Sequence, residues 1–95
     1  MSDYYARQRI LPQIGPDGQD RLAASTVVVV GCGALGTVQA ELLARAGIGR
    51  LVVVDRDRVD LTNLQRQLLY TPDDAAQRRL KALAAAERLR VVNPD

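Results

Sequence analysis

Residues 26–36 read Thr-Val-Val-Val-Val-Gly-Cys-Gly-Ala-Leu-Gly, an apolar run of strand length that leads into a glycine-rich turn and the start of a helix. A second apolar run ends at Asp55, about 20 residues further on, where an acidic residue completes the pattern of a nucleotide-binding βαβ unit. Strand, glycine loop, helix, strand and acid all fall in the required order. The stretch therefore predicts a Rossmann-like unit that binds a nucleotide.

Each glycine of the loop has its own steric reason. Gly31 lets the chain leave the strand in a tight turn, Gly33 removes the Cβ that would block a phosphate or ribose, and Gly36 lets the helix pack close to the sheet. The free N–H groups and the positive end of the helix dipole then favour an anion. Glycine turns of this kind also occur for packing alone, which leaves a purely structural turn as the alternative.

The order of elements predicts an α/β fold, in which an incomplete parallel sheet is preceded by an N-terminal helical arm. The expected strands are residues 26–30 and 51–55, and the apolar second strand predicts that both of its faces are covered. The expected helices are a short one with Asp17 as candidate N-cap, one over 35–46 with Leu35, Val38, Leu42 and Leu43 at helical spacing, and one from Pro72, capped by Thr71, to about Arg90.

Composition narrows the class of protein. A chain of 95 residues holds one domain at most, and no stretch fits a transmembrane span or a signal peptide. Cys32 is the only cysteine, so no disulfide and no metal site built on cysteine pairs can form within the chain. A net charge of +2, interleaved acids and bases, and three aromatic residues argue against nucleic acid as a partner. We expect a cytoplasmic protein without a membrane partner.

The segment after Asp55 is too polar for a core and too long for an ordinary link between a strand and a helix, which is typical of a functional loop. In the helix that follows, one face carries an apolar residue every three positions. These residues are Leu80, Leu83, Ala86 and Leu89. A basic cluster of Arg78, Arg79 and Lys81 lies near the start of that helix, and the usual place for such a cluster is a solvated face.

The chain resembles the N-terminal part of the ubiquitin-activating-type adenylyltransferase superfamily, the ThiF/MoeB/HesA-like enzymes. The blocks that carry the resemblance are Tyr5-Ala6-Arg7-Gln8 with Ile10-Leu11-Pro12, Gly15 with Gly18-Gln19, the Gly31–Gly36 loop, Asp55-Arg56-Asp57 with residues 59–67, and Asn93-Pro94-Asp95. The Asn-Leu-Gln-Arg-Gln of residues 63–67 is far more specific than the glycine loop. The resemblance implies that residues 1–95 are the N-terminal portion of a single ThiF-type ATP-binding domain, with its remainder expected beyond Asp95.

In that family, ATP and Mg²⁺ are the cofactors with which the C-terminal carboxylate of a small ubiquitin-like or sulfur-carrier protein is adenylated. The resemblance implies the same activity here, in a homodimer. It assigns the ribose to Asp55, and nucleotide or metal to Asp57. The other residues that it assigns to the nucleotide are Thr62, Asn63, Leu64, Gln65 and Arg66. The residues that it makes catalytic are Arg7, which reaches the partner's phosphates, Arg66 and Lys81.

The position of the family's phosphate-binding lysine depends on the direction of counting. Counting forward from Asn63 reaches Arg79, whereas counting back from Asn93 reaches Lys81. A two-residue insertion near residues 75–77 reconciles the two counts. We choose Lys81 because a compact ammonium followed by Ala82 fits the pattern better, and Arg79 is the alternative.

Two other functions compete with adenylation. An NAD-dependent oxidoreductase shares the glycine loop and the acid, but it gives no reason for Asn63, Arg66 and Arg7. A non-catalytic nucleotide-binding or dimerisation remnant would keep only the first half of the fold. For the arm, the scarcity of apolar residues before Ile10 predicts that it extends away from its own core. The resemblance implies that it carries Arg7 to a neighbouring subunit, and a solvated arm with a surface arginine is the alternative.

Overall fold

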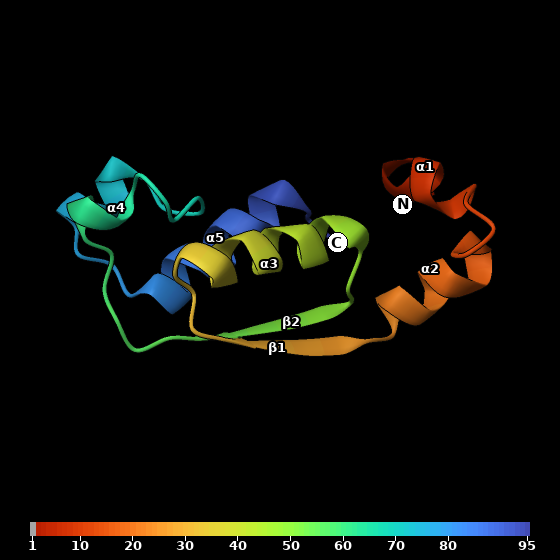
Figure 1. The fold of residues 1–95 in the computed structure, drawn as a ribbon, viewed down its shortest axis with the longest axis horizontal. Coiled ribbons are helices and arrows are strands. Elements are labelled where there is room, and N and C mark those ends of the chain that lie inside the picture. The colour runs from red at the N-terminus through yellow and green to blue at the C-terminus, as the bar shows by residue number, and fades with distance from the viewer. Residues whose placement is uncertain (1) are drawn as a thin grey trace.

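Two parallel strands with helices beside them form the centre of the computed structural model, which describes residues 2–95 (Figure 1). In chain order the elements are a 3-10 helix η1 (Ser2–Tyr5), α1 (Ala6–Arg9), α2 (Gly15–Ala23), β1 (Thr26–Val30), α3 (Ala34–Ala46), β2 (Arg50–Val54), a 3-10 helix η2 (Leu61–Asn63), α4 (Pro72–Ala76) and α5 (Lys81–Val92). The molecule is elongated, 43 × 20 × 19 Å, with α1 and α2 at one end and α4 at the other. The predicted α/β fold and its βαβ unit are confirmed.

The sheet is covered on one face among the described residues. β1 and β2 pair in parallel from Thr26↔Arg50 to Val30↔Val54, and α3 and α5 lie side by side above them (Figure 1). Val29 is buried beneath these helices, whereas Val28 and Val30 on the opposite face are 55% and 77% exposed. The expectation that both faces are covered is therefore wrong for the described chain, because α5 packs beside α3 rather than across the sheet.

Small side chains form the buried face of α3. Its buried residues are Gly36, Thr37, Ala40 and Ala44, whereas Leu35, Val38 and Leu42 are exposed. Of the four residues expected on the apolar face, only Leu43 packs against the core, and it is partly buried. The helix lies so close to the glycine loop that its fully buried positions hold small side chains. A Cβ built on Gly36 would lie 1.9 Å from the carbonyl oxygen of Gly31. The steric reason given for the third glycine of the loop is confirmed.

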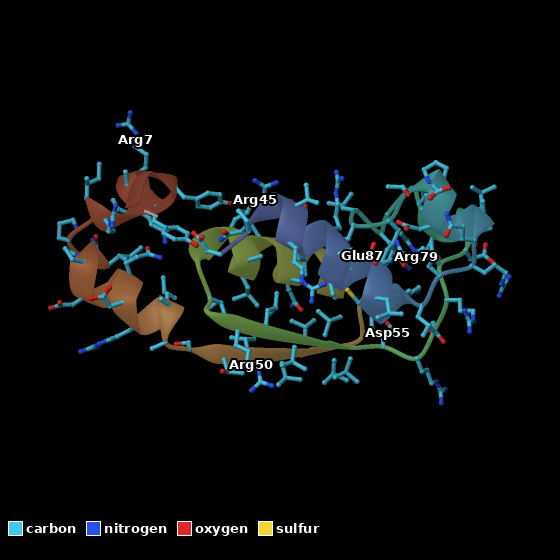
Figure 2. The ribbon with its side chains drawn as sticks, turned by 180° about the vertical axis from the view of Figure 1, so that it is seen from behind. Arg7, Arg45, Arg50, Asp55, Arg79 and Glu87 are labelled. Carbon is cyan, nitrogen blue, oxygen red and sulfur yellow. The ribbon has the colours of Figure 1, made fainter. Side chains whose placement is uncertain are left out.

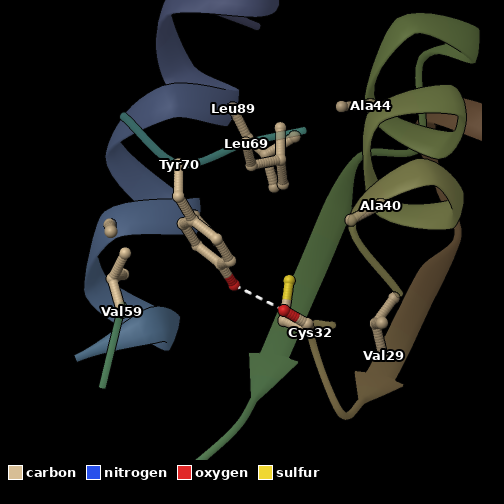
Figure 3. Close-up of a cluster of buried hydrophobic side chains, with 10 residues drawn as sticks. Val29, Cys32, Ala40, Ala44, Val59, Leu69, Tyr70 and Leu89 are labelled. Carbon is tan, nitrogen blue, oxygen red and sulfur yellow. Dashed lines mark hydrogen bonds between the residues drawn. The ribbon is translucent and has the colours of Figure 1, made fainter. Parts of the chain in front are cut away.

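The core lies between the two helices and the segment that follows β2 (Figure 3). It consists of Val29, Cys32, Ala40, Ala44, Val59, Leu69, Tyr70, Ala84, Ala85 and Leu89. The Tyr70 hydroxyl donates a hydrogen bond to the Cys32 carbonyl oxygen at 2.6 Å, and burial raises the pKa of Tyr70, which keeps it a neutral donor. Burial also raises the pKa of the Cys32 thiol, so Cys32 is a packing residue of the loop.

The predicted helix from Pro72 to Arg90 is two helices. Its start is as expected, since the Thr71 side chain and the Asp74 side chain cap each other's backbone N–H groups. The helix then ends at Ala76, Arg78 has a left-handed φ of 49°, and α5 begins at Lys81. The break over residues 77–80 lies next to the place where the sequence analysis infers a two-residue insertion.

The break also changes which residues of α5 are buried. The described buried positions are Lys81, Ala84, Ala85 and Leu89, while Leu83 is 58% exposed. The predicted face of Leu80, Leu83, Ala86 and Leu89 is therefore only partly correct. The basic cluster does not form one solvated face either, because Lys81 is 7% exposed.

The N-terminal arm is helical, as predicted, but it is anchored to the body of the protein. Tyr5 is 8% exposed and accepts a hydrogen bond from the Asn93 side-chain amide at 2.7 Å, while Tyr4 donates to the Val92 carbonyl at 2.9 Å. The expectation of an arm that extends away from its own core is wrong, because two tyrosines supply the anchors. In α2 the N-cap is Ile14 rather than Asp17.

The close approach at Gly36 gives a test of the fold. Replacing Gly36 by Ala places a methyl group against backbone atoms, which cannot rotate away, and we expect a loss of about 1–3 kcal/mol or more in the free energy of unfolding. The gain in helix propensity, about 0.5–1 kcal/mol, does not offset this. Denaturant titration followed by circular dichroism measures the difference.

Gly33→Ala is the matched control. Its new Cβ would meet only the Gln67 side chain, at 3.7 Å, and its backbone φ of −97° suits any residue. A Gly36→Ala protein as stable as Gly33→Ala would contradict the packing described above.

Candidate functional site

One carboxylate joins the loops at the carboxyl ends of the two strands. Asp55 follows β2, and its Oδ2 accepts from the Cys32 N–H in the glycine loop at 2.7 Å, while its Oδ1 accepts from the Asp57 N–H at 2.7 Å. The Gly31 N–H donates to the Val54 carbonyl at 2.7 Å and draws the same loops together. Gly31 has a φ of 86°, which explains the glycine.

The N-terminus of α3 opens at this loop. Its N-cap residue is Gly33, which has no side chain to accept from the N–H groups of the first turn. The first backbone bond of the helix runs from the Thr37 N–H to the Gly33 carbonyl at 3.0 Å. A helix of 13 residues thus presents its positive end without a side-chain cap at its N-cap residue, in the place where the sequence predicts an anion.

The polar loop after Asp55 has its own internal structure. Asp60 accepts from the Thr62 N–H at 3.0 Å and from the Thr62 hydroxyl at 2.9 Å, while Asn63 Oδ1 accepts from the Asp60 N–H at 3.0 Å. This capping box forms the short helix η2. Two predicted nucleotide ligands are thereby held by one residue: Thr62 by the Asp60 carboxylate and Asn63 by the Asp60 N–H. The Asn63 amide nitrogen remains available to donate a hydrogen bond.

The next residues of the motif divide between solvent and core. Gln65 and Arg66 are exposed, and Arg66 Nη1 donates to the Thr62 carbonyl at 3.1 Å. Leu64 is half-buried and packs against the core cluster. Asp57 is exposed beside Asp55. The structure therefore brings the acids, Thr62, Asn63 and Arg66 to one end of the sheet.

A short antiparallel contact brings Lys81 to that same end. The Val59 N–H donates to the Arg79 carbonyl at 2.8 Å, and the Lys81 N–H donates to the Asp57 carbonyl at 2.9 Å. Lys81 is 7% exposed, and this backbone pairing holds it beside Asp57, which in turn bonds to Asp55, the residue that bonds the glycine loop. No hydrogen bond or ion pair of the Lys81 ammonium is found within residues 2–95.

Arg79, the alternative to Lys81, is held by two acids. Its guanidinium contacts Asp74 at 3.0 Å and Glu87 at 2.6 Å (Figure 2). The Glu87 hydrogen bond, with a smaller contribution from Asp74, raises the pKa of Arg79. The two terminal nitrogens of the Arg79 guanidinium are therefore already bound to acids of α4 and α5.

Sequence reasoning passed over Gln67, the last residue of the Asn-Leu-Gln-Arg-Gln block. Its side chain is 5% exposed, and its Oε1 is buried without a hydrogen-bond partner in the described structure. Its Nε2 lies 3.7 Å from the point where a Cβ of Gly33 would be. Gln67 could have been picked out because it belongs to the Asn-Leu-Gln-Arg-Gln block. Nothing in the sequence shows, however, that its side chain lies next to Gly33.

Arg7 lies far along the molecule from these residues. It is exposed on α1, at the end opposite to the one that carries Asp55 (Figure 2). The hydrogen bonds above join the glycine loop, Asp55, Asp57 and the backbone of Lys81, while Thr62, Asn63 and Arg66 lie in the loop that follows Asp57 and Arg7 lies at the opposite end of the molecule. In the described range no helix is long and apolar enough to cross a membrane, and no three potential metal ligands cluster.

A parallel strand–helix–strand unit with a glycine loop and an acid at the carboxyl ends of its strands defines a Rossmann-like α/β domain. Within that class the chain belongs to the ThiF family, whose sequence profile matches residues 5–95. The sulfur carrier protein ThiS adenylyltransferase of Bacillus subtilis is 50% identical over 95 residues, which are all of this chain and 28% of that protein.

Two further comparisons agree with this assignment. The sulfur carrier protein adenylyltransferase of Thermus thermophilus is 52% identical over 92 residues, 97% of this chain and 33% of that one. The crystal structure of Escherichia coli MccB with ATP superposes with a TM-score of 0.85 at 32% identity, over 99% of this chain and 29% of that one. The chain spans a third or less of the length of each of these proteins.

The capping box makes the loop sensitive to acid. The hydrogen bonds from the Thr62 N–H and then from its hydroxyl hold the pKa of Asp60 below its ordinary value of 3.8. A lowered pKa stabilises the loop above the ordinary value, and this stabilisation is lost as the pH falls through the lowered one. In Thr62→Val, which loses the hydroxyl but keeps the N–H, we expect the Asp60 pKa to move part of the way back. Titration of the carboxyl carbon by NMR measures it.

Thr62→Ser provides the comparison, since it keeps the hydroxyl and with it the lowered pKa of Asp60. If Asp60 titrates at its ordinary value in the unsubstituted protein, the capping box does not form in solution.

Proposed function

We propose that this protein uses ATP to adenylate the C-terminal carboxylate of a small ubiquitin-like or sulfur-carrier protein. The observation that carries the proposal is Lys81, a residue only 7% exposed whose backbone pairs with Asp57 and whose ammonium has no acid bound to it in the described structure. An ammonium with no acid bound to it is available to pair with an anionic ligand. A triphosphate at the open N-terminus of α3 would be such a ligand.

The reaction needs charge neutralisation more than it needs a base. One oxygen of the carrier's carboxylate attacks the α-phosphorus, the bond from the α-phosphorus to the bridging oxygen breaks, and pyrophosphate leaves with that electron pair. Negative charge gathers on the phosphate oxygens as an anion approaches a polyanion, so positioned cations and N–H donors lower the barrier. Lys81, Arg66 and the first turn of α3 have the charge and the position for this.

The remaining residues suit the rest of the nucleotide. Each carboxylate oxygen of Asp55 accepts one hydrogen bond from a backbone N–H. Each oxygen can accept another, which would come from a ribose hydroxyl. The free amide nitrogen of Asn63 and the fork of Arg66 fit phosphate oxygens. Mg²⁺ would arrive with the triphosphate as part of the substrate, with Asp57 as the exposed acid closest in sequence to Asp55. The relatives are named adenylyltransferases, which further supports ATP over NAD.

The proposal also includes a homodimer in the cytoplasm, where ATP is at hand. Arg7 is exposed on α1, at the far end of a molecule 43 Å long. It cannot contact phosphates held at the glycine loop of its own chain without leaving its anchored arm. A second copy can bring its Arg7 to that loop, and this geometry supports the action of Arg7 in trans.

Exchange of labelled pyrophosphate into ATP, measured on the natural full-length protein with candidate carrier proteins, tests the activity. We expect carrier-dependent exchange, and we expect Lys81→Met to lower it about a hundredfold or more, because a neutral side chain of similar length removes charge from the transition state. ATP binding without exchange for any carrier would favour the non-catalytic remnant, and tight binding of NAD without ATP would favour the oxidoreductase.

Arg79→Met is the matched substitution for the choice between the two cations. It removes a cation two residues away that Asp74 and Glu87 already hold, and we expect exchange to change much less. Should Arg79→Met abolish exchange while Lys81→Met keeps it, the assignment of the phosphate ligand is reversed.

Arg7 can be tested by mixing two inactive variants. Arg7→Ala lacks the arginine that is proposed to act in the partner's site, and Arg66→Ala lacks an arginine that is proposed to act in the site of its own subunit. A mixed dimer holds one site in which both arginines are intact, so we expect activity to return in part when the variants are mixed. Steady-state exchange assays on the mixture measure this.

Subunit exchange is verified by mass spectrometry of differently tagged copies. If mixed dimers form and no activity returns, Arg7 serves its own subunit and the trans arrangement is wrong.

A further inference from the structure

The C-terminal end of α3 is bound by side-chain amides from three other segments of the chain. The last carbonyl groups of a helix have no partner within the helix. The carbonyl oxygen of Ala46, the last residue of α3, accepts from Gln8 Nε2 at 2.7 Å and from Gln19 Nε2 at 3.1 Å. The Ala44 carbonyl accepts from Asn93 Nδ2, just after α5, at 2.6 Å. The N-terminal arm, α2 and the end of α5 thus meet at the end of α3 that lies away from the glycine loop (Figure 1).

Gln8 is the amide that the arm contributes, and it follows Arg7 directly in α1. Gln8 Nε2 also donates to Gln19 Oε1, and Gln19 is only 5% exposed. On the other side of Arg7, buried Tyr5 accepts from the Asn93 amide at 2.7 Å. The arm is therefore fixed to the body on both sides of Arg7, while Arg7 itself is exposed and points away from the body (Figure 2).

The packing at this contact is close enough to require a glycine. Gly47 follows α3 with a φ of 96°. A Cβ there would lie 2.6 Å from Gln19 Nε2 and 2.9 Å from the Tyr5 ring. The arm and α2 therefore pack directly against the end of α3.

Through α3 the arm is linked to the candidate site of its own subunit. The helix begins at the glycine loop and ends at the amide contacts, and its 13 residues span about 20 Å. An arm that is fixed to one end of this helix has a set position relative to the glycine loop at the other end. In a dimer with two-fold symmetry the same surface is used by both copies, so that position also decides where Arg7 reaches the partner.

We propose that Gln8 is a positioning residue for the reaction, which holds the arm on α3 so that Arg7 meets the phosphates in the partner's site. This rests on the proposed function, because the action of Arg7 in trans belongs to it. A shift of about 1 Å in a group that binds the transition state can cost about a hundredfold in rate. Gln8 thus acts through Arg7 and does not itself touch the nucleotide.

Mixed dimers of the natural full-length protein test this proposal, because they show in which subunit Gln8 is needed. In a dimer of an Arg66→Ala chain with an Arg7→Ala chain, the intact site lies in the Arg7→Ala chain and takes its Arg7 from the Arg66→Ala chain. Gln8→Met removes the amide at nearly constant length. Placed in the Arg66→Ala chain, which supplies Arg7, we expect it to lower pyrophosphate exchange about tenfold.

The same substitution in the Arg7→Ala chain is the internal comparison. The arm of that chain brings no arginine to the intact site, so we expect exchange to change less than twofold. A general loss of structure would instead act at least as strongly there, because that chain holds the intact site. Native mass spectrometry counts the mixed dimers, and exchange is expressed per mixed dimer.

Two further variants complete the test. Gln13→Met changes an exposed glutamine in the turn between α1 and α2, and we expect less than a twofold effect in either chain. Tyr5→Phe keeps the ring and loses only the hydroxyl that accepts from Asn93, so it should show the same dependence on the chain that carries it. Thermal melting shows whether each variant is folded, and Tyr5→Phe carries the test if Gln8→Met is not.

Two results would overturn the proposal while the mixed dimer without Gln8→Met is active. One is an equal or larger loss when Gln8→Met is in the Arg7→Ala chain, and the other is no loss when it is in the chain that supplies Arg7. In either case this inference fails alone. If mixed dimers form and none of them is active, the trans arrangement of the proposed function fails and takes this inference with it.

Discussion

The arrangement of the site depends on one carboxylate. Asp55 accepts the Cys32 N–H with one oxygen and the Asp57 N–H with the other, each at 2.7 Å. Hydrogen bonds to a carboxylate are stronger than those between neutral groups. They fix the glycine loop relative to the loop after β2, and through the Asp57 carbonyl they fix the start of α5. An acid that the sequence marks as a ligand is thus also the structural link between the three segments that form the site.

The second constraint is close packing at the glycine loop. With Gly36 against the Gly31 carbonyl, the fully buried positions of α3 all hold small residues, and Leu43 is only partly buried. Leu35, Val38 and Leu42 of α3 are exposed, as are Val28 and Val30 on the other face of the sheet. The close contact between the backbones of Gly36 and Gly31 is kept, and Leu35 and Leu42 stay exposed. Leu35 and Leu42 are 79% and 63% exposed as a result.

The features that depend only on residues close together in the sequence were predicted correctly. β1 was predicted to the residue, and the Thr71 cap and the turn at Gly31 follow from side-chain and backbone preferences within a few residues. The errors lie where distant segments decide. Nothing within residues 4–11 shows that Tyr5 will meet Asn93, and nothing near Gln67 shows that its amide will lie over Gly33. The family resemblance gathered the site residues, but only the fold shows which of their atoms are left without partners.

The break between α4 and α5 explains why two neighbouring cations have different environments. In one continuous helix, positions 79 and 81 would be about 200° apart around the axis, and their backbone groups would bond within the helix rather than to residues 57–59. Instead Arg78 turns the chain with a φ of 49°, and residues 79–81 run beside residues 57–59. That short pairing holds Lys81 beside Asp57, while the Arg79 guanidinium contacts Asp74 and Glu87. A guanidinium with two carboxylates already bound gains little from a phosphate, because it must give up those contacts first. An unpaired ammonium gives up nothing, and the break is therefore what makes Lys81 the cation available to an anion.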